Sequence, residues 1–197
     1  MYMEENQREK EAKEENVDMD KRLILIGPTN SGGNMLIEEK NPNIEPKRQM
    51  KINNGLDLSE YVYCFRDREM VKKILVFQTP AKNKAYQDLI KILKFESSVT
   101  ILVYSINSNQ TLKDVIQQYY EPIKALKTDC KFILVGTGEY ITEEERKQAM
   151  EEANLEIKGK KFKDVFIISP KNINEVNRVL DRAAKILYES NGCCPCF

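Results

Sequence analysis

The sequence contains no histidine. Histidine is the commonest general base and the commonest metal ligand, so its absence excludes Ser-His-Asp chemistry and histidine-bearing zinc sites. Net charge is also absent, because 31 Lys and Arg residues balance 31 Asp and Glu residues, and nothing points to nucleic acid as a partner. No apolar run has membrane-spanning length, and the chain does not open on a signal-peptide core. We therefore expect a cytoplasmic protein that meets a membrane only through a covalent attachment.

Cysteine is too unevenly placed for a disulfide framework. Of the five cysteines, Cys64 and Cys130 are isolated, while Cys193, Cys194 and Cys196 crowd the last five residues. This usage is typical of a reducing, cytosolic compartment. Three thiols without a histidine or a fourth cysteine nearby do not complete a tetrahedral site, so we expect no metal there.

The C-terminal cysteines instead suggest lipidation. The last four residues fit the C-a-a-X pattern loosely, and Phe197 at the final position favours geranylgeranyl. Pro195 is atypical for the pattern, and no polybasic run precedes it. Since stable anchoring needs two lipids, the three adjacent thiols are sufficient. We expect lipid on these cysteines, and the alternative is an unmodified end.

Length and composition predict one globular domain between two tails. With 197 residues, of which 41% are hydrophobic, the chain can bury one ordinary core. Residues 1–20 are dominated by charged and polar types and have too few aliphatic residues to offset the entropy of ordering, so we expect a disordered tail. The domain is expected over 21–190, and residues 191–197 form the cysteine-rich tail.

Short aliphatic runs alternate with segments of helical periodicity. Near-continuous aliphatic runs are typical of strands buried on both faces of a parallel sheet. The alternation predicts an α/β fold with a mostly parallel, six-stranded sheet and five helices, in which ligands bind at the carboxyl ends of the strands. The range 41–55 is interpreted as a long loop. Strands are expected at 22–26, 60–65, 73–77, 99–104, 131–135 and 164–168, and helices at 34–40, 85–94, 111–127, 142–153 and 173–189.

A phosphate-loop pattern lies at the first strand-to-helix junction. The pattern G-x-x-x-x-G-K-[ST] needs glycines for close approach to phosphate, a Lys for the β- and γ-phosphates, and a hydroxyl for Mg²⁺. Gly27 and Gly32 are kept, but Gly33 replaces the Lys and Asn34 replaces the hydroxyl. We expect a vestigial phosphate loop formed by Gly27, Asn30, Ser31, Gly32, Gly33 and Asn34, with an unliganded turn as the alternative.

Taken together, this order of elements resembles the Ras superfamily of small GTPases, most closely its Rab branch. The resemblance covers about 21–197. It rests on Ile-Leu-Val-Tyr-Ser-Ile at 101–106, on Tyr-Tyr-Glu at 119–121, on Phe-Ile-Leu-Val-Gly at 132–136, and on Asn-Asn-Gly-Leu-Asp at 53–57, which is similar to switch I. The ending is similar to the family's prenylated tail. The resemblance implies a three-layer P-loop fold and guanine nucleotide as the candidate cofactor.

The residues that the resemblance would assign to catalysis and Mg²⁺ are missing. Asn53 stands for the switch I Thr, and the D-T-A-G-Q motif of switch II is matched by residues 78–82. There, Gln78 lacks the carboxylate that holds Mg²⁺, Ala81 replaces a glycine, and Lys82 replaces the water-positioning Gln. Hydrolysis by the family mechanism is therefore not supported. We expect no tightly bound cofactor: GTP or GDP is the candidate ligand, and the residues that would hold Mg²⁺ are missing.

The base-reading motifs are altered as well. N-K-x-D is matched by Thr-Gly-Glu-Tyr at 137–140, so the carboxylate that reads guanine is lost unless Glu139 takes its place after a slip of one residue. S-A-K becomes Ser169-Pro170-Lys171, and Pro170 has no N–H to donate. We expect a vestigial base site formed by Thr137, Glu139, Ser169 and Lys171.

These departures predict a pseudo-GTPase. The resemblance implies an interaction module in vesicle traffic or membrane assembly, held by lipid on the cytosolic face of a membrane and binding proteins through 41–57 and 78–90. A divergent GTPase that binds nucleotide weakly or without Mg²⁺ is one alternative. A soluble structural subunit of a larger complex is the other.

Overall fold

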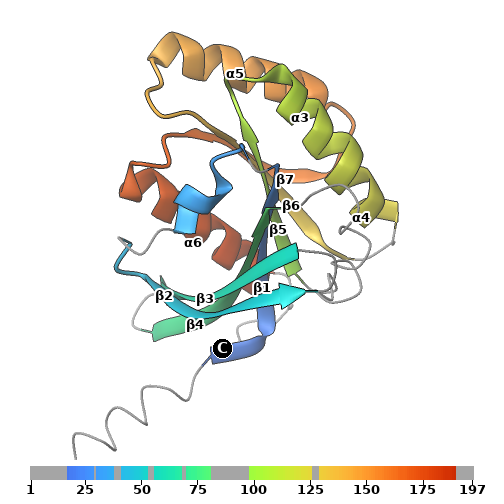
Figure 1. Ribbon diagram of the computed structural model, residues 1–197. Coiled ribbons are helices and arrows are strands. Elements are labelled where there is room, and N and C mark those ends of the chain that lie inside the picture. Colours follow the sequence, from blue (N-terminus) through green and yellow to red (C-terminus); the bar gives the residue numbers. More distant parts are fainter. Residues whose placement is uncertain are drawn as a thin grey trace, which may run out of the picture.

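A seven-stranded sheet runs through the computed structural model, which describes residues 17–28, 30–37, 41–52, 56–67, 70–80, 98–125 and 129–189 (Figure 1). The strand order is β2-β3-β4-β1-β5-β6-β7. Strands β4, β1, β5, β6 and β7 pair in parallel, whereas β3 is antiparallel to both neighbours. The α/β class and the mostly parallel sheet are confirmed. The strands are β1 (Val17–Gly27), β2 (Ile44–Ile52), β3 (Leu56–Asp67), β4 (Met70–Pro80), β5 (Ser98–Ser105), β6 (Lys131–Thr137) and β7 (Phe162–Ile168).

The prediction of six strands was wrong by one, because β2 lies in the range interpreted as a loop. Strand β2 is an edge strand that pairs only with β3. Its sequence, IEPKRQMKI, is mostly polar and includes Pro46, next to a shift in register. Charged residues and Pro are tolerated at a sheet edge, where half of the backbone groups need no ladder partner. The polar composition therefore hid a strand.

Strand β1 begins earlier than the aliphatic run that predicted it. Val17 and Asp18 pair with Lys73 and Ile74 of β4, and the register shifts before Arg22. The strand thus starts inside the range 1–20 that composition assigned to a disordered tail, since backbone pairing does not require aliphatic side chains. Residues 1–16, the expected helix at 85–94 and the cysteine tail at 191–197 lie outside the described residues.

One face of the sheet is covered by a helical run and by α5 (Glu143–Glu156). The run comprises α3 (Asn109–Val115), the π-helical turn η2 (Ile116–Tyr120) and α4 (Glu121–Ala125). The π turn ends just before Pro122, which has no N–H for a regular i→i−4 bond, and the Glu121 N–H donates to Ile116 O instead. The apolar stripe predicted for this helix, which includes Leu112, Val115 and Tyr119, is buried against the sheet.

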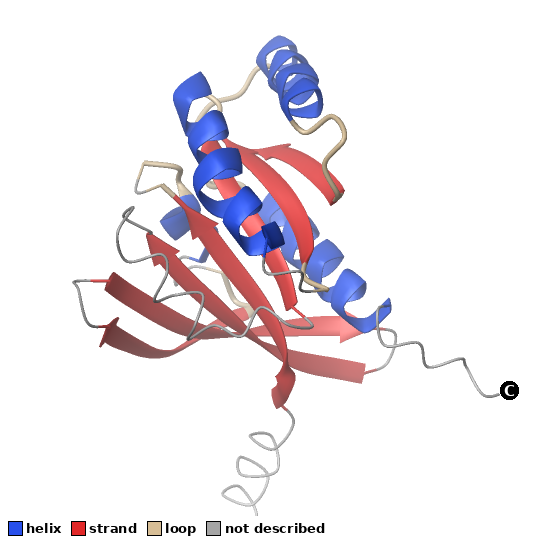
Figure 2. Cartoon of the chain, turned by 90° about the vertical axis from the view of Figure 1, so that its right-hand side faces the viewer, coloured by secondary structure: helices blue, strands red, loops and turns tan. Residues whose placement is uncertain are grey.

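Helix α6 (Ile173–Glu189) covers the opposite face, as Figure 2 shows. The two faces of β1 divide accordingly, because successive side chains of a strand point to opposite sides. Ile24 and Ile26 join the α3 and α5 side, whereas Leu23 and Leu25 join the α6 side. Two apolar layers enclose the central strands, so the carboxyl ends of β1, β6 and β7 are held in fixed positions.

The helix expected at 34–40 is only a 3-10 turn in the described residues, η1 (Gly33–Ile37). Met35 N–H donates to Gly32 O at 3.0 Å. Gly33 and Asn34 are poor helix formers, so little in the sequence favours a full α-helix at this junction. Residues 38–40 lie outside the described part of the chain.

Candidate functional site

Three loops at the carboxyl ends of parallel strands meet in space. The loop after β1 carries the phosphate-loop pattern, and the loops after β6 and β7 carry the altered base-reading motifs. Thr137 links the first two, because its Oγ1 donates to Ser31 O, and it also lies 3.2 Å from Tyr104 O. Thr137 is 3% exposed. The structure therefore brings the predicted phosphate and base residues together at the carboxyl ends of the parallel strands.

The two retained glycines are explained by packing alone. A Cβ at Gly27 would lie 2.5 Å from Ser31 Oγ and even closer to Val103 O, which no side chain could tolerate. Gly32 has φ +73°, a conformation that favours glycine, and a Cβ there would lie 2.9 Å from Thr137 Oγ1. Both glycines are required by the turn itself, so they do not imply a bound phosphate.

Within the turn, backbone donors are used internally. Ser31 N–H donates to Pro28 O at 2.9 Å, and Ser31 is 1% exposed. Asn30 and Asn34 lie on the exposed side of the loop. In the described part of the loop no cationic side chain is present, and this leaves the phosphate side without the charge that a nucleotide needs.

Gly33 stands where the family has Lys, and no steric demand accounts for it. A Cβ at Gly33 would meet Ser31 Oγ at 3.5 Å and Val103 Cβ at 3.8 Å, both ordinary contacts. The backbone at this position therefore tolerates a Cβ, so the glycine is not required by packing. The loss of the lysine removes a charge that the turn does not itself exclude.

On the base side, an acidic and a basic group neutralise each other. Lys171 Nζ lies 3.3 Å from Glu139 Oε2 and 5.1 Å from the centre of the Tyr140 ring. The hydrogen bond to Glu139 raises the pKa of Lys171 above its usual value. Ser169 Oγ also donates to Glu139 O at 2.9 Å. The loops after β6 and β7 are thus bound to each other, and the Glu139 carboxylate faces a lysine.

The backbone of the Ser169 loop is similarly occupied. Ser169 N–H donates to Glu175 Oε2 at 2.8 Å, and Arg146 Nη2 lies 3.1 Å from Glu175 Oε1. Arg146 Nη1 donates to Ile167 O at the end of β7. Since Pro170 has no N–H, this loop has few donors left for a purine carbonyl.

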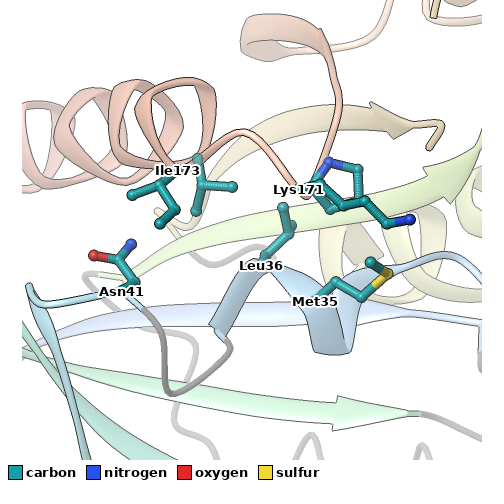
Figure 3. Close-up of a pocket in the computed structure, with 7 residues that line it drawn as sticks. Met35, Leu36, Asn41, Lys171 and Ile173 are labelled. Carbon is teal, nitrogen blue, oxygen red and sulfur yellow. The ribbon is translucent and has the colours of Figure 1, made fainter. Parts of the chain in front are cut away.

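A largely apolar cavity of about 440 Å³ opens between η1 and the start of α6 (Figure 3). Among the described residues that line it, the polar side chains are those of Asn41 and Lys171. Asn41 is 5% exposed; its Nδ2 donates to Asn177 Oδ1 at 2.7 Å, and its Oδ1 accepts from Asn43 N–H. The amide is therefore used to join the turn before β2 to α6. The lining residues are Met35, Leu36, Asn41, Pro170, Lys171, Ile173 and Val176.

Sequence reasoning singled out Pro170 and Lys171 but missed the rest of this cavity. No local sequence pattern marks it, because Ile173 reads as the first residue of the apolar stripe of α6, and only the structure shows that it is 40% exposed and lines the cavity. Asn53, Ala81, Lys82 and the terminal cysteines lie outside the described residues, as does the side chain of Gln78. In the part of the chain that is described, no group of three acidic or cysteine side chains is placed to hold a metal ion. No helix there is long and apolar enough to cross a bilayer.

Comparison with known proteins agrees with this arrangement. A search of curated protein sequences finds no match. The family model described as Ras family matches residues 22–189, which include all seven strands except the first residues of β1. The chain belongs to the Ras family.

Proposed function

We propose that this protein is a pseudo-GTPase of Rab-like type, which binds guanine nucleotide weakly or not at all and does not hydrolyse it. The observation that supports this most directly is the pairing of Glu139 with Lys171 on the base side, at 3.3 Å, opposite a phosphate loop with Gly33 in place of Lys. The phosphate-loop cation that a guanine nucleotide needs is missing, Tyr140 replaces the base-reading carboxylate, and the nearby Glu139 carboxylate is already paired with a lysine. The residues present therefore lack the groups with which an active family member would bind GTP and Mg²⁺.

The size of these losses favours a large change in affinity. Charge-assisted hydrogen bonds contribute roughly 1.5–3 kcal/mol each. Losing the phosphate-loop Lys and the base-reading Asp would weaken binding by about two to four decades, with non-additivity making the sum approximate. Loss of the Mg²⁺ ligands adds to this.

The remaining surface supports a role in protein contacts at a membrane. Strand β2 lies in the 41–57 segment and is the outermost strand of the sheet among the described residues, a position that favours pairing with another chain. The three C-terminal cysteines favour lipid attachment to the cytosolic face of a membrane. The role in vesicle traffic or membrane assembly follows from likeness to the Rab branch alone.

Nucleotide content tests the proposal. Heat-released nucleotide from the purified full chain is resolved by chromatography, and fluorescent GDP is titrated with and without Mg²⁺. We expect little or no co-purified nucleotide and no effect of Mg²⁺ on binding. Tight binding that is specific for guanine contradicts the proposal.

A divergent GTPase with weak, Mg²⁺-independent binding is the second candidate, and the cavity of about 440 Å³ beside Lys171 is the observation that favours it. Both candidates allow weak binding without Mg²⁺, so release of inorganic phosphate from GTP by the purified chain separates them, because only the divergent GTPase hydrolyses GTP. Mass spectrometry of the intact C-terminus of native material tests the membrane attachment. Unmodified thiols there favour a soluble subunit.

A further inference from the structure

A second pocket, of about 390 Å³, lies among lysines at the opposite end of the sheet. Four lysines line it, Lys124, Lys131, Lys161 and Lys163, against a single carboxylate, Asp129. The chain as a whole carries no net charge, so this is a local concentration of positive charge. A cluster of this kind favours a polyanionic ligand.

The fold builds this pocket from the amino ends of two parallel strands. Lys131 opens β6, Lys161 and Lys163 flank the first residue of β7, and Lys124 lies in α4, which precedes β6. The candidate nucleotide site lies at the carboxyl ends of the same strands. The two sites are therefore at opposite ends of the sheet and do not share residues.

An aromatic cluster fixes the pocket's backbone. Phe162 stacks on Tyr120 with ring centres 4.8 Å apart, and Phe132 contacts both rings. Tyr120 Oη accepts from Lys161 N–H at 2.9 Å. Cys130 is 8% exposed, and its Sγ lies 3.1 Å from Thr100 Oγ1. The backbone segments that carry Lys131, Lys161 and Lys163 are therefore held in place relative to one another.

None of the four lysine ammonium groups lies in an ion pair among the described residues. Other lysines of the chain are engaged: Lys160 Nζ donates to Glu156 O at 2.8 Å, and Lys171 pairs with Glu139. Among the described residues that line the pocket, four lysines therefore stand against one carboxylate. Lysine acts as a point charge toward phosphate and does not require fixed geometry, so it suits a headgroup with several phosphates.

The position of α6 indicates where such a ligand comes from. Helix α6 begins after the carboxyl end of β7 and runs back along the sheet, so it ends at Glu189 at the amino ends of the parallel strands (Figure 2). Near this end, Tyr188 stacks with Phe65 of β3 at 6.5 Å. The segment with three cysteines follows directly in the sequence. Lipid on those cysteines brings the lysine pocket's end of the sheet toward the bilayer.

We propose that the lysine pocket binds the multiply phosphorylated headgroup of an anionic membrane lipid and so seats the domain on the bilayer through its β6–β7 amino ends. This inference rests on the membrane attachment in the proposed function for its choice of a lipid over a soluble phosphate. Each lysine near an anionic surface strengthens binding by about fivefold.

The test uses the full chain without lipid, produced in bacteria, so that the pocket acts alone. Sedimentation with phosphatidylcholine vesicles that contain phosphatidylinositol bisphosphate is compared with sedimentation with phosphatidylserine vesicles of equal surface charge. We expect preferential binding to the former, and competition by soluble inositol trisphosphate. Lys131→Gln with Lys163→Gln reduces this binding by about 25-fold, at fivefold for each lysine.

Lys113→Gln with Lys147→Gln is the matched control, because both lysines are exposed on helices of the same sheet face but lie outside the pocket. This control leaves binding unchanged. Equal binding by the pocket variant and the native chain, or equal binding to both kinds of vesicle, overturns the proposal, as does binding of acidic peptide in preference to either lipid. The result is independent of nucleotide affinity and of the lipid found on native material, so failure here is distinct from failure of the proposed function.

Discussion

Two buried tyrosines carry hydroxyl groups in opposite situations. Tyr63 Oη donates to Asp181 Oδ1 at 2.6 Å, whereas Tyr104 Oη is buried with no hydrogen-bond partner among the described residues. Burial raises the pKa of both phenols well above the usual value, so both remain protonated in physiological solution. An unpaired buried polar group destabilises a fold, and a hydrogen bond to a charged partner stabilises it.

We therefore expect Tyr104→Phe to increase the free energy of unfolding by about 1 kcal/mol, and Tyr63→Phe to decrease it by about 1.5–3 kcal/mol. Urea unfolding followed by circular dichroism measures both changes. The two variants remove the same atom from the same residue type, so each is a control for the other. A loss of stability in Tyr104→Phe would mean that an ordered water satisfies the hydroxyl.

At the scale of elements, α5 begins with a complete capping box. Thr142 N–H donates to Glu145 Oε2 at 2.9 Å, and Glu145 N–H donates to Thr142 Oγ1 at 3.2 Å. The bonds that the Thr142 N–H and the Thr142 hydroxyl donate to Glu145 Oε2 lower the pKa of the Glu145 carboxyl. Because the folded pKa lies below the unfolded one, this stabilisation is present above the unfolded pKa and is lost as the pH falls through the folded pKa.

Thr142→Ala should cost about 1 kcal/mol at neutral pH, and the difference from the native chain should shrink in acid as Glu145 becomes protonated. Urea unfolding at neutral and acidic pH measures this. Ser108→Ala is the matched control, because Ser108 precedes α3 without a side-chain capping bond. A cost that is the same at both pH values would contradict a role for the Glu145 carboxylate.

The helices and strands that the sequence predicted well are those whose own residues determine their secondary structure. Strand β5 was expected at 99–104 and spans Ser98–Ser105, because its aliphatic run is buried on both faces. The capping box likewise marked the start of α5. Strand β2 was missed because its pairing depends on β3 and not on its own composition.

The parts of the candidate site that could be predicted are likewise those marked by short stretches of sequence. The loops that carry Gly32, Thr137 and Ser169 were expected to lie together because each contains a family motif of a few consecutive residues. The apolar cavity lies beside the hydrogen bond between Asn41 and Asn177, which are 136 residues apart. The lysine pocket joins Lys124 and Lys131 to the basic run KGKKFK at 158–163, which is visible in the sequence but does not by itself indicate a pocket. Such sites arise only when separate elements pack.

At the scale of the whole molecule, nucleotide binding and global stability are linked, because the loops that would bind a nucleotide come together only in the folded chain, where Thr137 Oγ1 donates to Ser31 O. A ligand stabilises the fold by RT ln(1 + [L]/Kd). At a nucleotide concentration near a millimolar Kd, this is about 0.4 kcal/mol. That shifts the melting temperature of a domain of this size by less than about 2 °C. We expect GDP with Mg²⁺ to leave the native chain's melting temperature almost unchanged.

Restoring the missing groups by Gly33→Lys with Asn34→Thr should change this, since a Cβ at Gly33 meets only ordinary contacts. A charge-assisted bond to phosphate improves affinity by about ten- to a hundredfold. The tenfold case gives about 1.4 kcal/mol at the same nucleotide concentration, which raises the melting temperature by about 3–6 °C in differential scanning fluorimetry. Asn30→Lys is the control, because it adds the same charge to an exposed position of the same loop. If the paired variant gains no more than this control, the turn that Ser31 N–H and Pro28 O close has lost the shape of a phosphate loop as well as its charge.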